Sequence, residues 1–336
     1  MSLTVPAEWS AHAAMWVGFP SHADLWGEDL EAAQQEVADF ALALADAGSE
    51  RVRLLICGEA AEKAARSLIG DASGVERVRG FFGDVWLRDT GPIFTLQGND
   101  LQAASFLFNG WGGKYVLADD DTVAEQIASA SGAMLNRHGF VVEGGALDHD
   151  GFGTVLTTRQ CLLNPNRNRD WTGEAAAEAA LSEALGARRV IWLGEGLVKD
   201  HTDGHVDNLT RFVAPGVVVC PVAFGSDDPN AEIYDEAARA LSAAKDARGV
   251  ALQVVRIPSP GRIVDADGEP CPASHMNFVI ANSAIILPTY EIEAASLALD
   301  ALQGLFPERR VIGLPAKALL TGGGSFHCIT QQEPLP

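Results

Sequence analysis

The hydrophobic and polar positions of this chain repeat a helix-then-strand unit five times. In the first unit, apolar side chains recur at helical spacing over residues 28–47, and residues 51–56 have the composition of a β-strand. The same order returns with predicted helices at 119–131, 172–185, 229–246 and 291–303, each followed by a strand-like run. A glycine stands at or near the end of every predicted helix, and we expect left-handed caps at Gly48, Gly132, Gly186, Gly249 and Gly304.

Further strand-like runs lie between these units, for example at 216–220 and 282–287. Each unit therefore holds more strand than a simple βα repeat, and repetition at this period is typical of radial or stacked architectures. We expect one closed α/β domain spanning residues 1–336, with a doubly wound open sheet as the second choice. No Gly-x-Gly-x-x-Gly motif follows an early strand, which argues against dinucleotide binding.

The composition narrows the class of partner. The chain has 336 residues, 47% of them hydrophobic, and its net charge of −21 argues against binding to nucleic acid or to an anionic membrane. No apolar run approaches the ~20 residues that span a bilayer, and the first residues lack the pattern of a signal peptide. Five dispersed cysteines are typical of reduced thiols, so we expect a cytoplasmic protein.

The densest polar cluster is His201-Thr202-Asp203-Gly204-His205-Val206-Asp207. On an extended segment, His201, Asp203, His205 and Asp207 would project from one face. One interpretation is a metal site, because imidazole and carboxylate groups are good ligands for divalent metals. A second is an acid/base site in which an imidazole transfers protons, and a third is a polar loop with local hydrogen bonds.

A second cluster, Asp84-Val85-Trp86-Leu87-Arg88-Asp89, runs into a Gly91-Pro92 break. Trp86 and Asp89 are three residues apart, so they share a face only if the chain bends near Arg88. An aromatic ring beside a carboxylate suits a planar cation such as a guanidinium. The alternative is an ion pair between Arg88 and a neighbouring acid at the end of a strand.

Three loops add weaker signals. Glu143 follows a strand and precedes a double glycine, and a carboxylate there could orient a histidine, as in hydrolytic triads. Residues 109–115 place Trp111 among glycines, a common composition for a binding loop. Residues 163–168 contain turn-forming residues, to which we assign a structural role.

Near the end of the sequence, Gly322-Gly323-Gly324-Ser325-Phe326-His327-Cys328 presents one thiol after three glycines. This thiol is a candidate nucleophile; the alternative is a buried cysteine between a turn and an edge strand. On a strand, His327 and Cys328 would point to opposite faces, so the histidine that serves Cys328 should come from elsewhere. His205, together with Asp207, is the best candidate.

Four motifs, taken together, resemble the agmatine deiminase family. They are Asp84-x-Trp86-x-Arg88-Asp89-x-Gly91-Pro92, Glu143-Gly144-Gly145, Thr202-Asp203-Gly204-His205-x-Asp207 and Gly322-Gly323-Gly324-x-x-His327-Cys328-Ile329-Thr330-Gln331-Gln332. The resemblance extends over nearly the whole chain, from Pro6 to Pro334. That family is related to bacterial peptidylarginine deiminases and belongs to the guanidine-modifying superfamily. The resemblance therefore implies a five-bladed α/β propeller (pentein type) of pseudo-symmetric ββαβ units.

The resemblance also implies roles for individual residues. Cys328 corresponds to the nucleophile, His205 to the general acid/base, and Glu143 to the partner of that histidine. Asp89 and Asp207 correspond to the carboxylates that clasp the guanidinium.

Two tryptophans complete the implied site. Trp86 falls in the substrate-binding motif, and the loop that carries Trp111 is similar to that of the agmatine enzymes. The implied substrate is a small cationic guanidine, agmatine, which is hydrolysed to N-carbamoylputrescine and ammonia through a covalent thiouronium on the cysteine. The implied reaction requires no metal and no other cofactor, and the possibility of a homo-oligomer is left open.

Several positions depart from the family pattern. Ala146 stands where Asn is frequent, and Ser325-Phe326 where Asn-Ile is common; His275 replaces a more usual aromatic residue, so we expect it to affect the pocket wall.

Other functions compete with this interpretation. The nearest alternatives are the activities of a peptidylarginine deiminase and of an arginine deiminase. The distant rivals are a metal-dependent amidohydrolase built on the 201–207 cluster and a non-catalytic guanidine-binding or scaffold protein.

Overall fold

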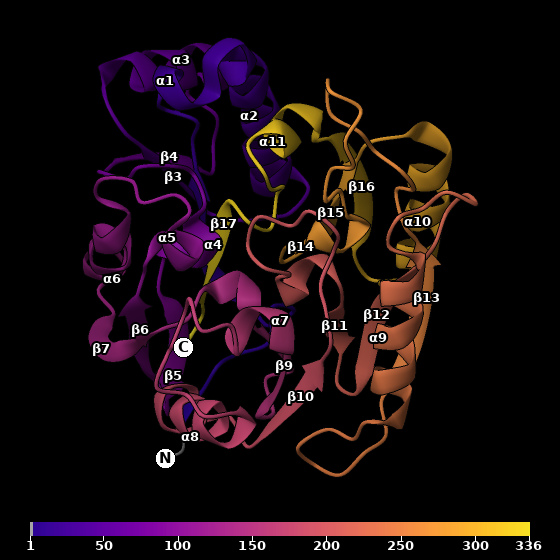
Figure 1. Ribbon diagram of the computed structural model, residues 1–336. Helices are drawn as coiled ribbons and strands as arrows, with labels where there is room; N and C mark the ends of the chain where they lie inside the picture. Colours follow the sequence, from indigo (N-terminus) through magenta and orange to yellow (C-terminus); the bar gives the residue numbers. More distant parts are fainter. Residues whose placement is uncertain (1–2) are drawn as a thin grey trace.

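The computed structural model describes residues 3–336, whose strands form five small sheets. Figure 1 shows these sheets following one another around a common centre, with the long helices on the outside. The expected five-bladed α/β propeller is therefore confirmed, and the doubly wound open sheet, our second choice, is wrong. Each sheet has only three or four strands, so no single sheet continues across the molecule.

Three blades share one ββαβ plan, in which an antiparallel pair is followed by a helix and then by a strand parallel to the second. The first of these comprises β8 (Asp148–His149), β9 (Thr154–Thr158), α8 (Glu174–Leu185) and β10 (Arg189–Leu193). The second comprises β11 (Arg211–Ala214), β12 (Val217–Val222), α9 (Ala231–Ala243) and β13 (Gln253–Pro258). The third comprises β14 (Val279–Ile280), β15 (Ala284–Thr289), α10 (Ile292–Leu305) and β16 (Arg310–Pro315).

The other two blades add a fourth strand to the same plan. One comprises β1 (Leu3–Thr4), β5 (Ile93–Gln97), β6 (Asp100–Leu107), α6 (Val123–Ser131) and β7 (Met134–Val141). The other comprises β17 (Thr330–Pro334), β2 (His12–Gly18), α2 (Leu30–Asp46), β3 (Val52–Ile56), α3 (Glu59–Ile69) and β4 (Val75–Arg79). In this blade β17 pairs antiparallel with β2, with Gln331 opposite Trp16. The two ends of the chain thereby close the ring.

Short helices lie in the connections within and between blades. The α-helical turns are α1 (Ala23–Trp26), α4 (Leu87–Thr90), α5 (Gly110–Gly113), α7 (Arg159–Leu162) and α11 (Lys317–Thr321). The 3₁₀ turns are η1 (Gly27–Asp29), η2 (Asp120–Thr122), η3 (Gly144–Ala146), η4 (Val206–Asn208) and η5 (His275–Asn277). Several of these turns, rather than the regular strands, carry the polar motifs found in the sequence. Within residues 3–336, no helix combines the length and the apolarity needed to cross a membrane.

The expected glycine caps are only partly correct. Gly132 and Gly186 follow α6 and α8 with φ of 71° each, as a left-handed cap requires. Gly304 lies inside α10, and α9 ends at Ala243, well before Gly249. Gly48 follows α2 for another reason: a Cβ there would lie 2.5 Å from the carbonyl oxygen of Leu44, so close approach requires glycine.

The centre of the ring is charged, whereas the blades have apolar cores. The Arg211 guanidinium is fully buried; its Nε donates to Asp148 Oδ1 at 2.9 Å, and it also pairs with Glu8. Arg211 further donates to the carbonyl of Phe278 at 3.0 Å. Because an unpaired buried charge is costly, these contacts tie the N-terminal segment and two blades to one cation.

Candidate active site

A cavity of about 250 Å³ is lined by residues from three of the four sequence motifs, and Glu143, His205 and Asp207 are not among its lining residues. Its walls come from segments that are far apart in the chain, and they include Leu25, Trp26, Asp84, Trp86, Asp89, Trp111, Tyr115, Leu117, His201, Thr202, Gly322, Gly323, Gly324 and Cys328. Three of the lining side chains are indoles, and Asp89 and Cys328 are buried at 7% and 8% exposure. The cavity therefore offers flat apolar walls with a carboxylate and a thiol.

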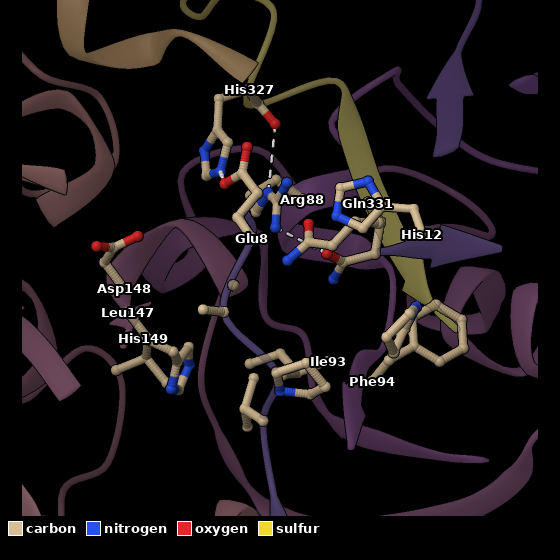
Figure 2. A pocket seen from close by; sticks show the side chains of 16 residues that line it. Glu8, His12, Arg88, Ile93, Phe94, Leu147, Asp148, His149, His327 and Gln331 are labelled. Carbon is tan, nitrogen blue, oxygen red and sulfur yellow. Dashed lines mark hydrogen bonds and ion pairs between the residues drawn. The ribbon is translucent and has the colours of Figure 1, made fainter. Parts of the chain in front are cut away.

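Cys328 lies in the turn that precedes β17, and Arg88 holds this turn in place. The backbone amide of Arg88 donates to the carbonyl of Cys328 at 3.0 Å, and its Nε donates to the carbonyl of His327 at 3.3 Å. Figure 2 shows the same guanidinium beside Gln331, to whose Oε1 it donates at 2.8 Å. Arg88 thus joins the Asp89 motif to the Cys328 motif, and the predicted alternative of an ion pair with a neighbouring acid is wrong.

The sulfur of Cys328 lies among polar groups although the side chain is buried. Asn277 Nδ2 lies 3.2 Å from Sγ, and Asp207 Oδ2 lies 3.9 Å away. Burial raises the pKa of the Cys328 thiol well above 9, and the charges of Asp207 and Asp89 raise it further. Burial and these two carboxylates therefore favour the neutral thiol over the thiolate.

His327 holds Asp207 and does not serve Cys328. Its Nδ1 lies 2.8 Å from Asp207 Oδ2 and its Nε2 lies 3.1 Å from Glu8 Oε2, the contact drawn in Figure 2. Burial alone would raise the pKa of Asp207, but the His327 hydrogen bond and the electrostatic interactions with His327, His205 and Arg211 together outweigh it and lower this pKa. Residues 327–328 are not on a strand, so the predicted reason for excluding His327 is wrong. His327 is excluded for another reason, because carboxylates contact both of its ring nitrogens.

Asp89 reaches the cavity because the chain bends as expected near Arg88, where α4 makes a single turn. Its Oδ1 accepts the backbone amide of Gly145 at 2.9 Å, and its Oδ2 accepts the indole N–H of Trp111 at 2.9 Å. Trp111 has a φ of 52°, so the loop over residues 110–113 is held in a left-handed turn. The Trp111 loop therefore positions the carboxylate of Asp89.

The double glycine allows three charged side chains to converge. A Cβ at Gly145 would lie 2.5 Å from His205 Nδ1, 2.8 Å from Asp89 Oδ1 and 3.2 Å from Asp207 Oδ2. A Cβ at Gly144 would lie 2.1 Å from the carbonyl oxygen of Arg88. Any side chain at either position would displace its neighbours.

His205 is buried, with only 1% of its surface exposed, and carboxylates face it from two sides. Its Nδ1 lies 3.7 Å from Asp89 Oδ1 and its Nε2 lies 4.0 Å from Glu143 Oε2. Burial would lower the pKa of His205, but neighbouring groups, with the charge of Asp89 first among them and that of Glu143 as well, outweigh it and raise this pKa well above its ordinary value of 6.5. The imidazole is therefore protonated at neutral pH and can act as an acid.

Arg167 supports Glu143 from within the segment that we assigned only a structural role. Its Nε donates to Glu143 Oε1 at 2.6 Å, its Nη1 donates to Asp203 Oδ2 at 2.7 Å, and its Nη2 donates to the carbonyl of Thr202 at 2.8 Å. The guanidinium is fully buried. Arg167 thus ties Glu143 to the loop that leads into His205.

The structure corrects two further expectations. Residues 201–205 form turns and are not extended, and Asp203 pairs with Arg167 and Lys114, so the four side chains do not share a face. His275 is fully buried, its Nδ1 lies 2.9 Å from the carbonyl oxygen of Pro258, and it does not line the cavity. The expected effect of His275 on the pocket wall is therefore wrong.

Trp86 lies on the cavity wall, as expected for the substrate-binding motif. Its indole N–H donates to Asp84 Oδ2 at 2.8 Å, and Trp26 donates to Asp84 Oδ1 at 3.0 Å. A Cβ at Gly324 would lie 2.5 Å from the Trp86 ring. The glycine run before Cys328 therefore lets the backbone pack directly on this ring.

The comparisons with known proteins agree with this arrangement. Residues 4–334 match the Porphyromonas-type peptidyl-arginine deiminase family. An agmatine deiminase from Ectopseudomonas mendocina is 38% identical, with 99% of this chain and 95% of that protein covered. An agmatine deiminase structure from Enterococcus faecalis superposes with a TM-score of 0.93 at 30% identity, covering 99% of this chain and 96% of that one.

A third relative was solved with a ligand. An agmatine deiminase from C. jejuni, in a cysteine-to-serine variant with substrate bound, superposes with a TM-score of 0.88 at 26% identity, covering 98% of this chain and 96% of that one. The family match spans nearly all of the chain, and the relatives are covered almost end to end. This chain therefore belongs to the Porphyromonas-type peptidyl-arginine deiminase family.

Proposed function

We propose that this chain is an agmatine deiminase, which hydrolyses agmatine to N-carbamoylputrescine and ammonia. One observation carries the proposal: Cys328, whose Sγ lies 3.9 Å from Asp207 Oδ2, lines a cavity together with Asp89, and Asp89 Oδ1 lies 3.7 Å from His205 Nδ1. A thiol, two carboxylates and an acidic imidazole are the groups that attack on a guanidinium carbon requires. The identity to agmatine deiminases over almost the whole chain supports agmatine as the substrate.

Asp89 and Asp207 would bind the guanidinium. Asp207 Oδ1 is buried and has no hydrogen-bond partner among the described residues, whereas Oδ2 is held by His327. A planar guanidinium can donate two parallel hydrogen bonds to a carboxylate, and this geometry would fix its central carbon near the sulfur. The indole walls would pack against the methylene chain of the substrate.

The bound cation would also activate the nucleophile. In the free enzyme the two carboxylates raise the pKa of the Cys328 thiol. A guanidinium between them offsets their charge and so favours the thiolate, which Asn277 Nδ2 stabilises at 3.2 Å. Activation is thus tied to substrate binding.

The reaction would then proceed in two halves. The thiolate attacks the guanidinium carbon, a C–S bond forms, and His205 gives its proton to the departing nitrogen, which leaves as ammonia. A thiouronium remains on Cys328. Neutral His205 next takes a proton from water, and the resulting hydroxide attacks the same carbon. The C–S bond then breaks to release the ureido product, and the hydroxyl proton of the adduct returns the sulfur to its thiol form. Glu143 would keep the imidazole oriented throughout.

The test is the release of ammonia from agmatine, arginine and a peptidyl-arginine ester, measured side by side. We expect turnover of agmatine with formation of N-carbamoylputrescine and at most weak turnover of the other two. Cys328→Ala should abolish turnover while agmatine still binds. Faster turnover of arginine or of the ester would show that agmatine is not the preferred substrate. Full activity of Cys328→Ala would show that Cys328 is not the nucleophile.

We further propose a cytoplasmic location. The five cysteines, Cys57, Cys161, Cys220, Cys271 and Cys328, are all free, which fits a reducing compartment. Fractionation of the native host with a cytoplasmic marker enzyme tests this location. Recovery of the protein outside the cytoplasmic fraction would contradict it.

A further inference from the structure

A second buried thiol lies beside His205, and the proposed reaction does not use it. Cys161 is on α7, is fully buried and does not line the substrate cavity. Thr158 caps α7: its Oγ1 accepts the backbone amide of Cys161 at 3.3 Å and donates to the carbonyl of Gly204 at 2.6 Å. This hydroxyl therefore ties α7 to the turn that carries His205.

Two polar atoms beside this thiol are buried without a partner. His205 Nε2 and Glu143 Oε2 have no hydrogen-bond partner among residues 3–336, and they lie 4.0 Å apart. Both side chains are at most 1% exposed. Glu143, Cys161 and His205 each offer one atom that can bind a metal, and these three atoms all lie within 4.8 Å of one another. A buried polar atom without a partner is unusual in a folded protein, and here two such atoms belong to side chains that also lie beside the Cys161 sulfur.

We propose that Glu143, Cys161 and His205 form an inhibitory binding site for a thiophilic divalent cation of the zinc class. Sulfur, imidazole nitrogen and carboxylate oxygen are the three ligand types of zinc, at about 2.0–2.3 Å from the ion, and three protein ligands leave a fourth position open. The pairing with sulfur selects Zn²⁺, Co²⁺ or Cd²⁺ over Mg²⁺ and Ca²⁺, which prefer oxygen ligands.

The charges around the site are compatible with such an ion. Binding releases the thiol proton and the proton on His205 Nε2, so the ion is offset by one thiolate and one carboxylate. Arg167 remains on the other oxygen of Glu143 and stays paired with Asp203. The cation of Arg167 is therefore not left uncompensated when Glu143 Oε2 turns to the metal.

Metal binding would stop catalysis by occupying the imidazole that transfers protons. This consequence rests on the proposed function, because it requires His205 to be the acid/base. The binding of the metal does not rest on the proposed function, since it needs only the side chains of Glu143, Cys161 and His205. The two statements can therefore be tested separately.

Cobalt is the probe for binding, because thiolate coordination gives Co²⁺ a charge-transfer band in the near ultraviolet. We expect this band on titrating the metal-free enzyme with Co²⁺ and its loss on adding Zn²⁺ but not Mg²⁺. Cys161→Ser should lose the band, whereas Cys328→Ala and the buried-cysteine control Cys220→Ser should keep it. A band that survives in Cys161→Ser or disappears in Cys328→Ala overturns the site.

Crystals of the wild-type enzyme soaked with Zn²⁺ provide a measurement that needs no variant. We expect an anomalous peak between Cys161 Sγ, His205 Nε2 and Glu143 Oε2, and a peak only at Cys328 or at the surface overturns the site. Inhibition is tested separately with the half-inhibitory concentration of Zn²⁺, which should rise at least ~10-fold in Cys161→Ser relative to that variant's own activity. An unchanged value, with the peak present, overturns the inhibitory role alone.

Discussion

The side-chain amide of Asn277 holds both the sulfur and the backbone of Cys328. Nδ2 lies 3.2 Å from Sγ, while Oδ1 accepts the backbone amide of Cys328 at 3.3 Å and that of His327 at 2.9 Å. Nδ2 also donates to Asn208 Oδ1 at 2.9 Å, which fixes the orientation of the amide. One buried side chain therefore sets the position of Cys328, the proposed nucleophile, and places a donor beside its sulfur.

Replacing Asn277 should separate these two roles. Asn277→Ala removes the donor and the acceptor, and we expect kcat to fall by roughly 10²-fold, the usual cost of one missing donor to a developing anion. Asn277→Asp keeps an acceptor for the two backbone amides but replaces the donor by a charge near Asp207, so kcat should fall at least as far. Steady-state kinetics and the melting temperature of each variant check this. A wild-type kcat in Asn277→Asp would show that the donor to the sulfur is not needed and that Asn277 only holds the backbone amides of residues 327 and 328.

Arg167 should matter for catalysis although it is remote from the cavity. Arg167→Lys retains the charge but not the fork that binds Glu143, Asp203 and the carbonyl of Thr202 together. We expect kcat to fall by roughly 10- to 100-fold with little change in KM, because Glu143 orients His205 and does not contact the substrate. The control is Arg137→Lys, since Arg137 makes an exposed ion pair with Glu125. A rise in KM alone would contradict this explanation.

The sequence predicted the five-part architecture better than the contacts that join its polar segments. Helical periodicity located α2, α6, α8, α9 and α10 because each buries one apolar face against its blade. It could not identify Gly304 as an interior residue, because a glycine inside a packed helix has the same local pattern as a cap. Asn277 and Arg167 were missed because Cys328 and Glu143, their partners at the site, are 51 and 24 residues away in the chain. The stretch 163–168 carries turn-forming residues, and only tertiary contact distinguishes the buried Arg167 from a surface residue.

The buried Glu8 should make stability depend on acid pH. Burial would raise the pKa of Glu8, but Arg211 and His327 outweigh it and hold this pKa far below its ordinary value of 4.5. A depressed pKa means that the folded state binds fewer protons, so the stabilisation is complete above about pH 4.5 and is lost as the pH falls below it.

Glu8→Gln tests this dependence against the other carboxylates. At pH 7 the variant should lose roughly 3–5 kcal/mol of unfolding free energy, because Arg211 is left with one buried partner fewer. The difference from wild type should shrink as the pH is lowered from 4.5 toward 3, since only the wild type depends on an ionised Glu8. Denaturant unfolding across this range measures both curves. A difference that stays constant or grows toward acid pH would contradict the assigned pKa.

Asp207 should slow the reaction of Cys328 with an alkylating agent while it speeds turnover. Its charge lies 3.9 Å from the sulfur and raises the pKa of the thiol. In the free enzyme, the rate of alkylation of Cys328 by iodoacetamide should therefore be low at pH 7 and keep rising as the pH passes 9, without an earlier plateau.

Asp207→Asn removes that charge, so the thiol pKa falls and alkylation near neutral pH becomes faster. By contrast, kcat/KM for agmatine falls because the guanidinium loses one of its carboxylates. Mass spectrometry of the Cys328 peptide gives the rates, and the Cys57 and Cys271 peptides of the same digests are internal references because they lie outside the site. If alkylation of Cys328 slowed in Asp207→Asn, or reached its plateau below pH 8 in the wild type, the thiol would be ionised before substrate binds, and activation by the bound guanidinium would be wrong.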